Sequence, residues 1–307
     1  MKMNSLKVFI ATIALALSAV VSFAQDNAEL SEKTLPVGEF TSVNISGDFD
    51  VTLSKGSYTT KVTVNKVIAD YIEVYVRSKV LYISYNEKAV PKEVKKTLSG
   101  KGAAKPVFRA VVYAPQLDGV FLKDNAVLTG TDSFYGSSFS LEMEDKSQLK
   151  NLSITATKAS VSMKDKTQAV LILNTDADMD VKTDGSADLK LTATCKDLSL
   201  EGAGSSKLSA SANTGKFKLS GTGRSEITVS GRANTLEVKT DRNPKLDTRS
   251  LAVPEVTATM SGGDLRLAVE KVLDVDLTGG SELFYTGAPE MKIRRIVKST
   301  LAPDDKK

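Results

Sequence analysis

One pattern, repeated at a nearly constant spacing, constrains this chain more than any other feature. Each copy has an aliphatic residue, two or three variable residues, a turn of Asp, Gly, Ser, Asn or Lys, and a second aliphatic residue. Six clear copies begin at Leu141, Val161, Val181, Leu200, Leu219 and Val238, so they start 19 or 20 residues apart. Weaker copies begin at Ile45, Phe121, Met260 and Val275. A fixed period of this length is typical of a repeat architecture.

Between the turns, apolar and polar residues alternate. Leu189 and Leu191 alternate with Lys190 and Thr192, and Ile227 and Val229 flank a threonine in the same way. Alternation with a period of two indicates strands that have one buried face. A sustained helical period of 3.6 residues is missing from the sequence. We therefore predict an all-β protein.

Short strands at this spacing fit two architectures, an antiparallel sandwich or barrel and a parallel β-helix. Only the β-helix requires the same residue class at the same place in each repeat, because equivalent positions stack about 4.8 Å apart. The six matching copies favour a parallel β-helix with coils of about 19–20 residues over residues 116–296. In this register Leu189, Leu208 and Ile227 stack in the core of successive coils.

The region before the repeats has a different pattern. Residues 61–65, 71–76 and 80–85 form longer, tyrosine-rich strands with hairpin-like spacing, and residues 87–105 are rich in Lys and Gly. Solenoids need covered ends, because an open coil exposes unpaired strand edges. We predict that residues 35–115 form an N-terminal β segment with a capping antiparallel hairpin and a mobile loop at 87–105. Residues 297–307 are expected to form a C-terminal tail.

The start of the chain has the three parts of a secretory signal peptide. Lys2 and Lys7 precede an apolar run over residues 8–21, and Ser22-Phe23-Ala24 places small residues at the first and third positions before the expected cut. The alternative is a membrane anchor, but about 14 apolar residues fall short of the roughly 20 that a spanning helix needs. We predict a signal peptide over residues 1–24 and export to the periplasm, the cell surface or the medium, with no membrane-spanning segment after cleavage.

Three segments resemble a known family. Residues 40–56 (FTSVNISGDFDVTLSKG) resemble the opening of the head GIN family of adhesin domains of Bacteroidetes-type bacteria. Residues 108–129 resemble its middle segment, and residues 283–289 (LFYTGAP) resemble its closing motif. The resemblance covers nearly all of residues 35–296. It implies a right-handed single-stranded β-helix and an adhesin, and it supplies no catalytic residues.

Composition excludes several chemistries. The 307 residues include no His, no Trp and one Cys, which rules out a Ser-His-Asp triad, a Cys-His pair, imidazole metal sites and an internal disulfide. The lone Cys195 lies among alternating strand residues and is interpreted as a small buried hydrophobe rather than a reactive thiol. With 41 basic and 37 acidic residues, the near-neutral balance gives no case for nucleic acid. We expect no cofactor.

Three aspartates occupy the same place in successive repeats, namely Asp124, Asp145 and Asp165. Stacked carboxylates could recruit Ca²⁺, which prefers several oxygen ligands. Lys146 and Lys166 follow directly, however, so the charges can also interleave on a solvated corner. These aspartates are weak metal candidates, and our prediction is that the protein holds no metal.

Other polar and aromatic groups have two readings each. A D-x-D-x-D run at Asp176, Asp178 and Asp180 is interpreted as a solvated acidic stripe rather than a cation loop. Tyr71 and Tyr75 are expected to share a strand face, either as weak candidates for stacking on a sugar or as residues buried under the cap. Five charged residues are expected to project from one sheet in register, where they could do chemistry or simply face water: Glu142, Lys182, Glu201, Lys239 and Asp276. Four basic residues near the end are expected either to meet an anionic surface or, as the favoured reading, to form a charged edge that discourages end-to-end association: Lys292, Arg294, Arg295 and Lys298.

These observations favour an exported, non-catalytic β-helical adhesin or binding module for a glycan or a cell-envelope protein. A polysaccharide-active lyase or hydrolase on the same scaffold is one alternative. A structural envelope protein without a soluble ligand is the other. The sequence leaves the oligomeric state open.

Overall fold

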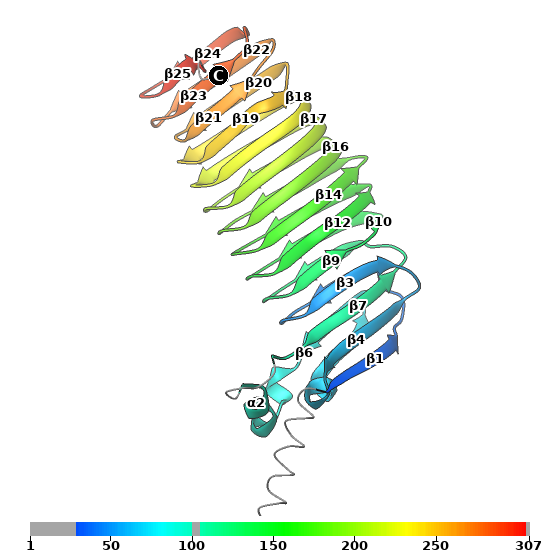
Figure 1. The fold of residues 1–307 in the computed structure, drawn as a ribbon. Coiled ribbons are helices and arrows are strands. Elements are labelled where there is room, and N and C mark those ends of the chain that lie inside the picture. The colour runs from blue at the N-terminus through cyan, green and yellow to red at the C-terminus, as the bar shows by residue number, and fades with distance from the viewer. Residues whose placement is uncertain (1–28, 100–104, 305–307) are drawn as a thin grey trace, which may run out of the picture.

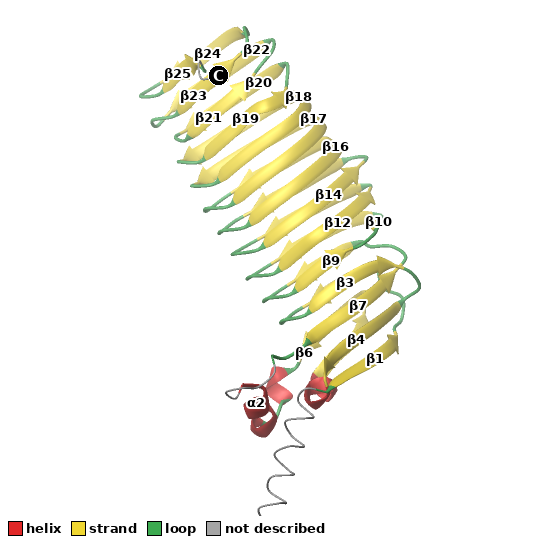
Figure 2. Cartoon of the chain, in the orientation of Figure 1, coloured by secondary structure: helices red, strands yellow, loops and turns green. Residues whose placement is uncertain are grey.

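The computed structural model describes residues 29–99 and 105–304, which form a long β-solenoid of about ten turns. The predicted signal peptide over residues 1–24 lies outside the described residues. Strands dominate, and they stack as rungs along the whole rod (Figures 1 and 2). The all-β class and the parallel coils predicted from the sequence are confirmed. No helix within the described ranges is long and apolar enough to cross a membrane.

Each coil contributes one strand to each of two stacked sheets, which we call sheets A and B. Sheet A consists, in spatial order, of β1 (Leu30–Pro36), β4 (Thr59–Asn65), β7 (Phe108–Ala114), β3 (Asp50–Lys55), β9 (Val127–Gly130), β12 (Gln148–Ala156), β14 (Gln168–Thr175), the first halves of β16 (Asp188–Gly202), β17 (Lys207–Gly223) and β18 (Glu226–Arg242), β19 (Lys245–Ala252), β21 (Asp264–Ala268), β23 (Glu282–Thr286) and β25 (Thr300–Pro303). The short strand β10 (Ser133–Tyr135) pairs with the second part of β12.

Sheet B lies opposite, and from residue 138 onward its strands alternate with those of sheet A along the chain. In spatial order it consists of β5 (Ile72–Arg77), β6 (Val80–Tyr85), β2 (Ser42–Ile45), β8 (Gly119–Leu122), β11 (Ser138–Met143), β13 (Lys158–Met163), β15 (Asp178–Thr183), the second halves of β16, β17 and β18, β20 (Glu255–Ser261), β22 (Val272–Thr278) and β24 (Glu290–Ile296). The strands β16 to β18 bend from one sheet into the other. The segment 297–307, expected to be a tail, contains β25, which extends sheet A.

The core is built from in-register columns of aliphatic side chains. Leu189 pairs with Leu208, and Leu208 pairs with Ile227, as the repeat register predicts. All three are at most 3% exposed. Their outward neighbours on the same strands, such as Lys190 and Ser209, are exposed. The apolar columns thus form one continuous core along the rod.

One corner position has the left-handed backbone conformation in the stacked coils from Gly47 to Gly279. At the bend from sheet B to sheet A, ten equivalent residues all have φ between 61° and 92°, namely Gly47, Asp124, Asp145, Asp165, Gly185, Gly204, Gly223, Arg242, Gly262 and Gly279. Gly adopts this conformation freely, and Asp is among the side chains that tolerate it best. The small-residue turns in the sequence therefore reflect a backbone requirement.

The coils do not follow chain order at the N-terminal end. The coil formed by β2 and β3 lies between two that come later in the chain, because β2 pairs with both β6 and β8, and β3 with both β7 and β9. Figure 1 shows β3 in blue between the green strands β7 and β9. After β3, residues 59–114 therefore form the N-terminal end of the rod. The chain then returns to the other side of β2 and β3, where β8 and β9 continue the stack towards the C-terminal end.

The N-terminal end carries the predicted elaboration. β5 and β6 form an antiparallel hairpin, and β1 and β4 add antiparallel strands to sheet A. The prediction of a mobile loop at 87–105 is wrong for its described part, which forms η2 (Glu87–Ala89) and α2 (Lys92–Ser99). The helix is stabilised because Val94 and Leu98, four residues apart, pack against the core. A further 3-10 helix, η1 (Lys66–Tyr71), connects β4 to the hairpin.

Two buried hydroxyls at the corner give a first prediction. Ser206 and Ser225 are fully buried, and the structure shows no hydrogen-bond partner for either Oγ. We expect Ser206→Ala to raise the free energy of unfolding by about 1 kcal/mol, because it removes an unsatisfied buried hydroxyl. Ser147 occupies the equivalent corner, but its Oγ donates a hydrogen bond to the Glu144 carbonyl over 2.9 Å. Ser147→Ala should therefore lower stability by a similar amount. Urea unfolding compares the two variants, and equal effects would contradict this account.

Candidate functional site

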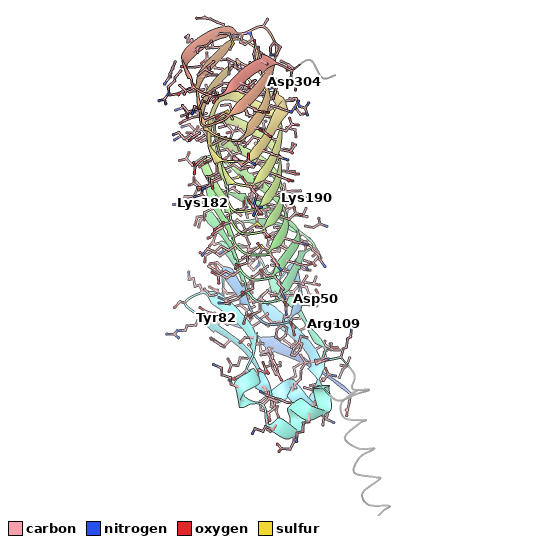
Figure 3. All side chains as sticks on the ribbon, turned by 90° about the vertical axis from the view of Figure 1, so that its left-hand side faces the viewer. Asp50, Tyr82, Arg109, Lys182, Lys190 and Asp304 are labelled. Atoms are coloured by element: carbon pink, nitrogen blue, oxygen red, sulfur yellow. The ribbon has the colours of Figure 1, made fainter. Side chains whose placement is uncertain are left out.

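The outer faces of the two sheets are the surfaces that the fold repeats along its length. Seen from the corner, Tyr82 and Lys182 project from sheet B, whereas Asp50, Arg109 and Lys190 project from sheet A on the opposite side (Figure 3). Because the register places equivalent residues on neighbouring rungs, their side chains form columns along the rod. Successive side chains within a column are about 4.8 Å apart. A functional site on this scaffold would therefore be formed by neighbouring columns on one of these two faces.

The five predicted charged residues do project from sheet B in one column. The register runs from Glu142 through Ser162, Lys182, Glu201, Ser220, Lys239 and Thr259 to Asp276. Each coil supplies only one of them. Several are paired along the face, since the Lys182 ammonium lies 4.0 Å from Glu201, and Arg295 donates to Asp276 over 2.8 Å. The column is therefore a ladder of compensating charges that spans many coils.

Three carboxyl groups have shifted pKa values, and none of the three shifts is the one that a catalytic acid needs. Glycoside hydrolysis by paired carboxylates needs one acid whose pKa is raised. A hydrogen bond from Lys239 instead lowers the pKa of Glu237, and a backbone hydrogen bond from Lys55 lowers that of Asp132. The pKa of Asp247 is lowered as well, through Arg249. These three shifts favour the ionised form, which cannot donate a proton.

The three corner aspartates stack as predicted, and the structure gives them a backbone role. An Asp124 carboxylate oxygen accepts the Gly47 N–H over 3.0 Å. Asp145 accepts the Asp124 N–H, and Asp165 accepts the Asp145 N–H, each over 3.3 Å. Each carboxylate thus ties its corner to the preceding coil. Within the described ranges, no group of three or more His, Cys, Asp or Glu residues has an arrangement that could hold a metal ion.

The prediction that Tyr71 and Tyr75 share a strand face is wrong for Tyr71. Tyr71 ends η1 and packs against the core, so it shares no strand face with Tyr75. Tyr75 is 45% exposed on the outer face of sheet B and stacks on Tyr82 of the neighbouring strand, with ring centroids 5.0 Å apart. The same column continues through Asn44 to Phe121. Hairpin register places these aromatic rings together, and spacing along one strand could not reveal it.

A groove of about 270 Å³ lies further along the same face. It is lined by six polar residues, Asp178, Asp180, Asp197, Ser199, Lys216 and Lys218, over a floor that includes Met179 and Leu198. The register places Asp178, Asp197 and Lys216 in one column, and Asp180, Ser199 and Lys218 in the next. Acceptors and donors therefore lie close together across three neighbouring rungs. Asp178 and Asp180 face solvent, as predicted from the D-x-D-x-D run, and Asp176 lies at the corner before them.

Cys195 is buried, and its Sγ lies 3.6 Å from the Thr214 Oγ1 of the next coil. Burial raises the pKa of its thiol, which disfavours the reactive thiolate. The prediction of a small buried hydrophobe is confirmed.

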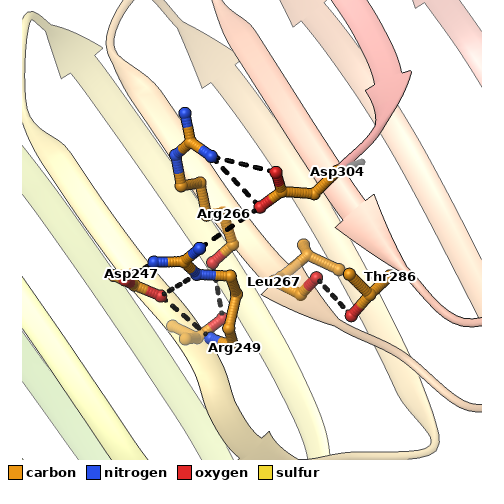
Figure 4. A network of polar contacts seen from close by, with 7 residues as sticks. Asp247, Arg249, Arg266, Leu267, Thr286 and Asp304 are labelled. Atoms are coloured by element: carbon orange, nitrogen blue, oxygen red, sulfur yellow. Dashed lines mark hydrogen bonds and ion pairs between the residues drawn. The ribbon is translucent and has the colours of Figure 1, made fainter. Parts of the chain in front are cut away.

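Near the C-terminal end, sheet A carries a network of ion pairs. Asp304, whose side chain is 3% exposed, accepts hydrogen bonds from Arg266 over 3.0 and 3.1 Å, and Arg249 links it to Asp247 (Figure 4). On sheet B, Arg294 and Arg295 of the edge strand β24 pair with Asp274 and Asp276. The register shifts within this strand, and bulged, charged edges discourage association with further strands.

The Asp247–Arg249 pair predicts a dependence of stability on pH. Two hydrogen bonds from the Arg249 side chain, of 3.0 and 2.6 Å, hold the pKa of Asp247 below its usual range. Ionised Asp247 therefore contributes stability that is fully present above its unfolded pKa of about 3.9 and is lost as the pH falls through the lower folded value.

We expect Asp247→Asn to lower the free energy of unfolding at pH 7 by at most about 1 kcal/mol, because the pair is partly exposed. The difference from the wild type should shrink below about pH 4. Urea unfolding at pH 7, 5 and 3 measures it, and a difference that is constant over this range would contradict the assignment.

Comparisons with known proteins agree with this architecture. The model of a family described as "Putative auto-transporter adhesin, head GIN domain" matches residues 39–212 and 177–289. Because these matches span most of the chain, the protein belongs to this adhesin family. The resemblance noted in the sequence is thereby confirmed.

Three solved structures match most of this chain. A "putative adhesin" from Parabacteroides distasonis ATCC 8503 has a TM-score of 0.51 and 17% identity, with 90% of this chain and 97% of that chain covered. A "putative adhesin" from Parabacteroides merdae ATCC 43184 has a TM-score of 0.48, 17% identity and the same coverage. A "Putative lipid binding protein" from Parabacteroides distasonis ATCC 8503 has a TM-score of 0.49 and 15% identity, again with 90% and 97% covered. The search of curated proteins finds no match to this chain.

Proposed function

We propose that the protein is an exported, non-catalytic adhesion module that binds a glycan through the outer face of sheet B. The groove formed by β15, β16 and β17 carries the proposal. Its carboxylates are acceptors and its lysines are donors, and sugar hydroxyls need both within a few ångströms. No ion pair within 4.0 Å is formed by Asp178, Asp180 or Asp197 in the described structure, so these carboxylates are available to hydroxyl donors.

The stacked tyrosines extend the same face towards the N-terminal end. Aromatic faces pack against the apolar faces of sugar rings, and Tyr75, which stacks on Tyr82, is still 45% exposed at the edge strand β5. A polysaccharide chain that lies along sheet B could contact both the groove and this ring. Membership of an adhesin family supports a binding role.

A glycan array with paired variants tests the proposal. We expect the wild type to bind at least one class of bacterial or host glycan, and Lys218→Ala in the groove to weaken that binding at least tenfold. Lys190→Ala removes an exposed lysine from the opposite sheet and serves as the matched control. Equal loss in both variants, or binding to no glycan, would contradict the proposed face. Co-purification with an envelope protein in the absence of any glycan ligand would favour the structural role.

Export is a separate part of the proposal. The charged start, the short apolar run and the Ser22-Phe23-Ala24 sequence support a signal peptide that is cleaved after residue 24. Intact-mass measurement of the protein from its native cells should give a chain that begins at Gln25. A chain that retains its first 24 residues would contradict cleavage at this point.

A further inference from the structure

An apolar cavity lies at the N-terminal end of the rod, on the inner side of the edge strands β1 and β5. Its volume is about 230 Å³, and eight residues line it: Ser31, Lys33, Leu35, Val62, Val64, Ala69, Ile72 and Val74. They come from β1, β4, η1 and β5, so both sheets contribute walls. The cavity is the solenoid interior at the point where the stack of described coils ends.

The walls continue the core, but only the part formed by β4 is fully buried. Val62 and Val64 are 4% and 3% exposed, and Ile72, Val74 and Leu35 are half-buried and pack against the same core. Water in such a space finds few hydrogen-bond partners, because apolar side chains form most of the lining. An alkyl chain would remove this apolar surface from water and is the chemistry that the walls favour.

Lys33 is the one charged residue in this lining. Its β1 position pairs with Val62, and its ammonium lies 3.7 Å from a carboxylate oxygen of Asp70. The Asp70 side chain is 92% exposed, and ion pairs this exposed are weak. An inward-pointing lysine on an edge strand also discourages association with further strands. That role alone does not explain the apolar cavity beside Lys33.

We propose that this cavity binds the alkyl chain of a free fatty-acid-type carboxylate, whose head group pairs with the Lys33 ammonium. At about 30 Å³ per water-sized group, the volume has room for roughly seven or eight methylenes. Each methylene added to the ligand should tighten binding roughly threefold to fourfold until the cavity is full. This site is separate from the glycan face and does not depend on it.

The first test is a chain-length series on the full chain. Calorimetric titration with the carboxylates from hexanoate to tetradecanoate, below their micellar concentrations, should show affinity that rises with length and levels off near ten carbons. Ile72→Trp fills the cavity and should weaken decanoate binding at least tenfold, as should Ala69→Phe from a different element. Ile172→Trp, on the outer face of sheet A, is the matched control and should bind as the wild type does.

The second test concerns the head group. Lys33→Ala should weaken decanoate about fivefold and leave decanol unchanged. Asp70→Asn should tighten decanoate binding severalfold, because it removes the competing carboxylate, and should also leave decanol unchanged. A purely structural role for Lys33 would leave the ratio of decanoate affinity to decanol affinity unchanged in both variants.

Three outcomes would overturn the proposal. The first is binding that is unaffected by Ile72→Trp and Ala69→Phe in folded proteins. The second is a wild type that binds no carboxylate when a variant starting at residue 29 does, which would show that the chain's own first residues fill the cavity. The third is binding to phospholipid vesicles that decanoate cannot displace, which would assign the cavity to membrane lipid.

Discussion

Leu208→Asp is expected to destroy the fold of the central coils. Leu208 is 3% exposed and lies between Leu189 and Ile227 in the core of sheet A. An aspartate there would place a carboxylate in an apolar column that offers it no partner. We expect a loss of more than about 4 kcal/mol, which is among the largest effects of single substitutions. Because each coil contacts only its neighbours, the stack should break at β17.

Ser209→Asp is the matched control for this experiment. Ser209 is the next residue on the same strand, points to solvent and pairs with Lys190. The same new charge should change stability by less than about 0.5 kcal/mol there. Circular dichroism and thermal unfolding compare the two variants. A soluble Leu208→Asp chain that melts with the wild type would contradict the register of the whole solenoid.

Gly262→Ala is expected to have the second largest effect. Gly262 occupies the left-handed corner position with a φ of 92°, and an added Cβ would lie 2.1 Å from the carbonyl oxygen of Arg242 in the preceding coil. Unfavourable φ alone costs roughly 1–2 kcal/mol. The steric overlap with backbone cannot be relieved without moving a coil, so the total loss should reach about 3 kcal/mol or more.

Gly280→Ala separates these two contributions. Gly280 directly follows Gly279, the equivalent of Gly262 in the next coil, and has a φ of 80°, but nothing lies within 4 Å of its added Cβ. This variant should lose only the conformational part, about 1–2 kcal/mol. Urea unfolding of both variants measures the difference. Equal losses would show that conformation alone, and not the spacing between coils, requires glycine at position 262.

The repeat predicted the solenoid because its physical requirements are local and recur in every coil. Aliphatic residues such as Leu208 and Ile227 mark the core, and Asp145 and Gly204 mark the left-handed corner. The same signal could not predict that β2 and β3 lie between later coils. Their neighbours β8 and β9 lie 77 residues further on, and an isolated early copy fits any position in the stack.

The candidate sites were less predictable for a similar reason. Tyr75 meets Tyr82 through the register of a hairpin, whereas spacing along one strand suggested Tyr71. The groove depends on Ser199 being small between Asp180 and Lys218, which only the stacking of three coils reveals. The helix α2 depends on two apolar residues, Val94 and Leu98, within a lysine-rich segment.

The proposed glycan-binding face is tested most directly by titrating the protein with the glycan that binds most strongly on the array. The mass of the glycan is then measured after the titration. We predict that the wild type binds the glycan and leaves its mass unchanged. Binding should be lost in a Lys216→Ala, Lys218→Ala double variant and retained in the Lys190→Ala, Lys207→Ala double variant on sheet A. Cleavage of the glycan, above all of a uronic-acid polymer, or equal binding by both double variants would contradict a non-catalytic site on sheet B.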